Sequence, residues 1–126
     1  MVCVLDEPHA FIDKAKSKLK SSKILYENEQ YGDSVGRSYY SMFLAAKALL
    51  IKKGYNVSSH KSLIGIFGNE YVNHGDFNPT IAKYLSGTQA LRDDSDYEAY
   101  DDISKNIAKE KIRQAESFII ESERFL

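Results

Sequence analysis

The chain has 126 residues, of which 43% are hydrophobic and 28% charged, and its formal net charge is −1. This length suffices for one domain with its own core, which we expect over residues 1–126, and the balanced charge excludes an overall field that attracts nucleic acid. The only cysteine, Cys3, excludes an internal disulfide and a cysteine-based zinc site. We expect neither a signal peptide nor a membrane span, and therefore a cytoplasmic protein.

The first predicted helix covers residues 8–30 and begins at Pro8, with Asp6 or Glu7 as its N-cap. Apolar side chains recur on one stripe of it, and five lysines make the helix basic. The apolar set is Ile12, Ala15, Leu19 and Tyr26, and the lysines are Lys14, Lys16, Lys18, Lys20 and Lys23. A turn is expected at residues 31–33.

The second predicted helix covers residues 34–53, with Asp33 as its cap and Gly54 as its end. Apolar residues recur at helical spacing, and two further apolar residues, Leu44 and Ala45, widen the apolar face. A face of this width predicts a central helix. The periodic set is Val35, Tyr39, Met42, Phe43, Ala46, Leu49 and Leu50.

Three more helices are predicted in the second half of the chain. The third covers residues 60–72 after a cap at Ser58 or Ser59 and is broken at residues 73–77. The fourth covers residues 79–92, because Asn78 and Pro79 are a cap followed by a proline at the first helical position. The last covers residues 105–125 after Ser104. No alternating pattern long enough for a sheet occurs, so we predict an all-α bundle of about five helices.

Four glycines fall within predicted helices, where each costs about 1 kcal/mol relative to alanine. They are Gly36, Gly65, Gly68 and Gly87. We interpret them as points of close helix packing within the monomer. A close contact between two copies, or backbone exposed near a ligand, is the alternative.

Several short pieces in chain order resemble the HEPN family (higher eukaryotes and prokaryotes nucleotide-binding domain), especially its small stand-alone prokaryotic members. The resemblance implies an up-and-down helical bundle that forms a homodimer. It also implies RNA cleavage, nucleotide binding, or pairing with a small nucleotidyltransferase in a toxin–antitoxin module. The pieces are Gly32-Asp33, residues 37–43 and 45–50, Ser59-His60-Lys61, Phe67 with Tyr71-Val72, Leu91-Arg92 and Asp96-Tyr97.

Ribonucleases of this family use an arginine followed, after four to six residues, by a histidine. Arg92 lies where the resemblance places the arginine, but the three positions for the histidine hold Tyr97, Glu98 and Ala99. We therefore expect a degenerate motif in a protein that is not an enzyme. The alternatives are a metal-independent endoribonuclease whose displaced base is His60 or His74, and a purely structural interaction module.

The predicted ligand site combines Arg37, Tyr40, Arg92 and Tyr97 in a polar groove that holds a phosphate and stacks a base. His60 and Lys61, at a helix start, are expected to help hold the phosphate. The opposing interpretation makes Arg37 a boundary arginine, packed on tyrosine and paired with an acid of residues 93–102. Those residues are interpreted as a solvated acidic connector, and neither a metal site nor a cofactor is expected.

Overall fold

The computed structural model of the chain describes residues 6–97 and 103–126. These residues form α1 (Glu7–Glu27), α2 (Tyr31–Lys52), α3 (His60–Phe67), a π-helical turn η1 (Gly68–Asn73), α4 (Pro79–Tyr97) and α5 (Lys105–Glu123). No strand occurs among them, which confirms the predicted all-α class. The same residues contain no helix with the length and apolar character needed to cross a membrane.

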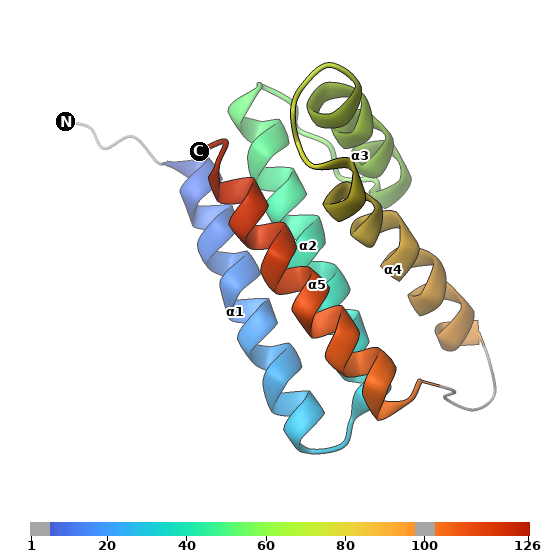
Figure 1. Cartoon of the computed structure of the whole chain (residues 1–126). Helices are drawn as coiled ribbons and strands as arrows, with labels where there is room; N and C mark the ends of the chain where they lie inside the picture. The colour runs from blue at the N-terminus through green and yellow to red at the C-terminus, as the bar shows by residue number, and fades with distance from the viewer. Residues whose placement is uncertain (1–5, 98–102) are drawn as a thin grey trace.

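The helix α2 is the centre of the bundle, as its broad apolar face predicts. It packs against α1 and α5 on one side and against α3 and α4 on the other. Figure 1 shows α1, α2 and α5 running along one another, with α3 and α4 beside them on the side of α2 away from α1. Large side chains of α2 such as Tyr39, Met42 and Leu49 are fully buried. The helix α2 as a whole therefore contacts each of the other four α-helices.

The helix starts follow the predicted caps at four of five positions. The side chains of Asp6, Ser59, Asn78 and Ser104 each accept a hydrogen bond from a backbone N–H in the first turn that follows. The exception is Asp33, because α2 begins earlier, at Tyr31.

The turn before α2 also lies earlier than predicted. It is formed by residues 28–30, and Glu29 takes a left-handed conformation with φ of 61°. Glutamate rarely adopts this conformation, so the glycine at position 32 was the misleading signal. At the other end, Gly54 has φ of 91° and follows the last turn of α2, as expected from its sequence.

Three other boundaries differ from the predicted ones. The third helix changes to a π-helical turn after Phe67, although helical structure continues to Asn73. The fourth extends to Tyr97 instead of ending at Arg92, and the fifth ends at Glu123 instead of Phe125. Phe77, which lies in the predicted break, is fully buried. It packs edge-on against Phe67, so the loop itself contributes to the core.

The interpretation of the helix glycines as close packing points is wrong for three of the four. A Cβ atom added to Gly65, Gly68 or Gly87 would meet nothing within 4 Å. Buried serines instead lie in the contact between α1 and α2. The Ser22 hydroxyl lies 2.6 Å from that of Ser38, and both side chains are fully buried. Short side chains that satisfy one another let the two backbones approach closely.

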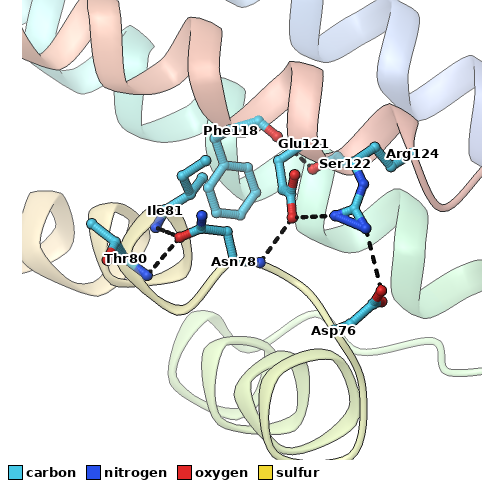
Figure 2. Close-up of polar contacts among 8 residues, drawn as sticks. All are labelled: Asp76, Asn78, Thr80, Ile81, Phe118, Glu121, Ser122 and Arg124. Atoms are coloured by element: carbon cyan, nitrogen blue, oxygen red, sulfur yellow. Dashed lines mark hydrogen bonds and ion pairs between the residues drawn. The ribbon is translucent and has the colours of Figure 1, made fainter.

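The loop before α4 is fastened to the end of α5 by a buried carboxylate, as Figure 2 shows. Glu121 is 8% exposed, and its Oε2 accepts from the backbone N–H of Asn78 and from Arg124, both at 2.8 Å. Arg124 also reaches Asp76 at 3.3 Å. Asn78 in turn accepts from Thr80 and Ile81 at the start of α4. This network fixes where α4 begins relative to α5.

Candidate functional site

A buried tyrosine of α2 holds a histidine at the start of α3. The Tyr39 hydroxyl lies 2.6 Å from Nδ1 of His60 and shares a hydrogen bond with it, and the two rings stack at 5.7 Å between centroids. Tyr39 is 1% exposed, whereas His60 belongs to the exposed surface. His60 is the first residue after the Ser59 cap, so the start of α3 places it against α2.

Phe43 is the second residue of α2 that positions this imidazole. Its ring centroid lies 4.1 Å from that of His60, with 17° between the planes. Tyr39 and Phe43 are four residues apart and therefore lie on the same face of the helix. The imidazole is thus fixed in two ways, by a hydrogen bond at Nδ1 and by stacking on its face.

Arg92 reaches the same tyrosine from α4. Its guanidinium carbon lies 5.5 Å from the centre of the Tyr39 ring, in the range of a cation–π contact. Its Nε would lie 3.8 Å from a Cβ atom at Gly36, an ordinary van der Waals distance, so Arg92 passes beside this residue of α2. Arg92 and His60 come from different helices and both contact Tyr39.

The arrangement unites two groups with complementary chemistry. A guanidinium presents a planar fork of donors that suits a phosphate, and a histidine can exchange a proton near neutral pH. Both lie against rings that hold them in place. The two groups are thus of the chemical kinds that proteins use to hold a phosphate and to transfer a proton.

Arg37 and Tyr40 of α2 and Lys61 of α3 are the other predicted ligand residues whose side chains the structure describes. Arg37 is exposed on α2, and Lys61 is exposed beside His60. Tyr40 is half-buried, and its ring lies 5.9 Å from that of Phe43 and 6.0 Å from Nζ of Lys18. Tyr97 ends α4, but its side chain, like those of residues 93–96 and the whole of residues 98–102, lies outside the described part of the chain.

The remaining histidines lie elsewhere. His74 follows η1, where its backbone N–H donates to the carbonyl of Asn69, and His9 pairs with Asp6 at the start of α1. Over residues 6–97 and 103–126, no group of three histidine, cysteine or acidic side chains is placed to hold a metal ion. Of the two histidines proposed as a displaced base, His60 is the one that shares a neighbour with Arg92.

The two residues that connect the site, Tyr39 and Phe43, were predicted only as core. They belong to the apolar stripe of α2 and are both buried, so periodicity describes them correctly but incompletely. The available signal was the polar end of Tyr39, because a buried tyrosine hydroxyl usually has a hydrogen-bond partner. The identity of that partner depends on how α3 packs.

Comparison with known proteins supports the family resemblance. A family model described as the HEPN domain matches residues 9–124. Two proteins of Methanocaldococcus jannaschii, each named "putative toxin", are 35% and 30% identical to the chain over 98% and 95% of its length and 86% and 82% of theirs. A UPF0332 protein of Pyrococcus horikoshii is 40% identical over 69% of the chain and 61% of its own length.

Proposed function

Because the chain belongs to the HEPN family, we propose that it is a nucleotide- or RNA-binding member of a toxin–antitoxin-like pair. The observation that carries this proposal is the meeting of Arg92 and His60 on Tyr39. The guanidinium would hold a phosphate, and the imidazole with Lys61 would supply further donors. Two of the relatives carry the word toxin in their names, which supports the toxin side of such a pair.

Binding measurements with variants of the site test this proposal. We expect Arg92→Ala and His60→Ala each to weaken the binding of nucleoside phosphates or short RNA about tenfold, because each removes a charge-assisted hydrogen bond. Arg113→Ala is the matched control, since Arg113 is an exposed arginine of α5 paired with Glu110. Equal affinity of wild type and both site variants, measured by calorimetry, would reject the site.

We also propose that the protein is a homodimer that pairs with a small nucleotidyltransferase, both on the family resemblance. An obligate dimer would bury about 2,000 Å² or more. Sedimentation at micromolar concentration tests the dimer, and a single species of 14.3 kDa, the mass of one chain, would contradict it. Co-purification with a nucleotidyltransferase encoded beside it tests the pairing.

A metal-independent ribonuclease is the second candidate function, and the Tyr39–His60 hydrogen bond favours it. A base is more effective when another group fixes its ring, as Tyr39 does through Nδ1 of His60. His60 would take the proton of a ribose 2′-hydroxyl through Nε2, and the 2′-oxygen would attack the adjacent phosphorus. The 5′-oxygen would leave with a proton from solvent, and a 2′,3′-cyclic phosphate would remain. Arg92 would stabilise the charged phosphorane.

Digestion of RNA without metal ions separates the two candidates. Loss of a positioned acid–base group costs about 10²–10⁴-fold in rate, so a degenerate motif predicts very slow cleavage by the wild type. Multiple turnovers that His60→Ala abolishes and His74→Ala preserves would instead establish His60 as the base. If His74→Ala abolished cleavage, the role proposed for His60 would be wrong.

A further inference from the structure

A strip of basic side chains lies along the outer junction of α1 and α2, beside the site. Lys18 of α1 lies over the Tyr40 ring of α2, with Nζ 6.0 Å from its centre. Lys47 of α2 lies over the Phe11 ring of α1, with Nζ at 5.3 Å. In one contact the lysine comes from α1 and the ring from α2, and in the other the reverse. The two contacts therefore identify the flanks along which α1 and α2 meet.

Helical spacing adds two more basic residues to the strip. Lys14 lies between Phe11 and Lys18 on α1, and Arg37 lies one turn before Tyr40 on α2. We call Lys14, Lys18, Arg37 and Lys47 the basic strip. No carboxylate occurs at the successive positions of these two flanks. The positions are 11, 14, 18, 21 and 25 on α1 and 37, 40, 44 and 47 on α2.

Two lysines on the opposite flank of α1 form ion pairs with α5. Lys16 pairs with Glu123 of α5 and Lys23 with Glu116, each at 2.9 Å. Their charges are compensated within the fold. The basic first helix thus has one flank with two lysines paired to α5, and another flank, toward α2, where Lys18 lies over the ring of Tyr40.

Ring contacts of α2 connect Tyr40, which lies beside the basic strip, to His60. Tyr40 lies 5.9 Å from Phe43, and Phe43 stacks on His60 at 4.1 Å. The strip spans about 15 Å along α2, from residue 37 to residue 47, because each helical residue adds about 1.5 Å. That length accommodates a few nucleotides of a single strand.

We propose that the basic strip binds the phosphate backbone of single-stranded RNA and guides it to Arg92 and His60, with one base stacked on Tyr40. The proposal rests on the proposed nucleotide- or RNA-binding function and adds the path of the ligand. Clustered cations beside a half-buried aromatic ring are how proteins bind single strands without reading sequence. A membrane surface fits less well, because Leu44, the aliphatic residue at the centre of the strip, is only 2% exposed.

A pair of double variants with equal change in charge tests the strip. Lys18→Gln with Lys47→Gln neutralises two strip lysines, and Lys16→Gln with Lys23→Gln neutralises two lysines that pair with α5. The probe is a short fluorescent oligouridylate, and its dissociation constant is measured by anisotropy over a series of salt concentrations. Thermal unfolding of each variant shows whether it is folded.

We expect the strip variant to bind about tenfold more weakly at low salt. Its slope of log affinity against log salt should fall by about 1.4, since each phosphate contact to a single strand contributes about 0.7. The control variant should keep the wild-type slope. Tyr40→Leu should weaken binding about tenfold with an unchanged slope, because it removes stacking but no charge.

The outcomes separate this inference from the proposed function. If the strip variant keeps the wild-type slope while Arg92→Ala weakens binding, the strip is wrong and the site stands. If neither the strip nor Arg92 affects binding, or the wild type binds no oligouridylate, the strip is also wrong. If an acidic peptide with the same net charge as the oligouridylate displaces it and binds more tightly than it does, the strip is a protein-docking surface instead.

Discussion

The hydroxyl of Tyr39 lies 2.6 Å from Nδ1 of His60, so a side chain in the centre of the bundle orients an imidazole on its surface. The same ring lies under the guanidinium of Arg92. Tyr39 is 1% exposed, and its helix α2 packs against α1, α3, α4 and α5. The site is therefore built on the core and not on a loop.

Removal of the Tyr39 hydroxyl should release the His60 ring while leaving the core filled. We expect Tyr39→Phe to lower the free energy of unfolding by about 0.5–1.5 kcal/mol, the usual contribution of one hydrogen bond. The balance between the Nδ1–H and Nε2–H tautomers of His60 should also change. Long-range ¹H–¹⁵N spectra of the histidine rings measure this, and Tyr40→Phe is the control. Identical His60 signals in Tyr39→Phe and wild type would contradict the role of the hydroxyl.

Phe43 should be important both to the core and to the site. It is 4% exposed, so Phe43→Ala should lower the free energy of unfolding by about 3–5 kcal/mol in chemical denaturation. Ile120 provides the contrast: it is 68% exposed on α5, and Ile120→Ala should change stability by less than about 0.5 kcal/mol. A loss below about 1 kcal/mol for Phe43→Ala would mean that Phe43 is not a core residue.

The buried carboxylate of Glu121 should stabilise the protein more than an exposed carboxylate of the same helix. Glu121→Ala leaves the backbone N–H of Asn78 without its acceptor and should cost about 1–3 kcal/mol. Glu123→Ala removes an exposed pair with Lys16 and should cost about 0–1 kcal/mol. Urea denaturation of the two variants measures the difference. Equal losses would show that the network at the start of α4 contributes nothing specific.

Stability should fall in alkaline solution through Tyr71. Burial of its hydroxyl and the nearby charge of Glu70 raise the pKa of Tyr71 to about 12, from about 10 in an unfolded chain. The folded protein therefore holds this proton more tightly than the unfolded chain. The protonated Tyr71 hydroxyl therefore stabilises the fold by an amount on the order of 2 kcal/mol. This contribution is complete below pH 10 and is lost as the pH rises toward 12.

The comparison of wild type with Tyr71→Phe isolates this effect. The hydroxyl donates to the carbonyl of Leu49 at 2.6 Å, so the variant should be less stable at neutral pH. The difference between the two proteins should then shrink between about pH 10 and 12. A difference in unfolding free energy that stays constant over this interval would contradict the raised pKa.

Features that depend on neighbours within one or two turns were predictable. The caps at Asp6, Ser59, Asn78 and Ser104 were predicted because a side chain bonds a backbone group two or three residues away. The central place of α2 followed from the width of its apolar face, and the family followed from short pieces in order. Asp33 failed as a cap because Glu29 makes the turn in a conformation that its residue type rarely adopts.

Features that depend on how helices pack were decided only by the tertiary structure. The apolar pattern classifies Tyr39 as core, but the packing of α3 and α4 against α2 makes it the contact between His60 and Arg92. In the same way, the sequence does not distinguish the five lysines of the first helix from one another. The packing of α5 does, because it brings Glu123 to Lys16 and Glu116 to Lys23. Spacing along the chain defines the face of one helix, whereas the distance between two helices depends on the side chains that fill the space between them.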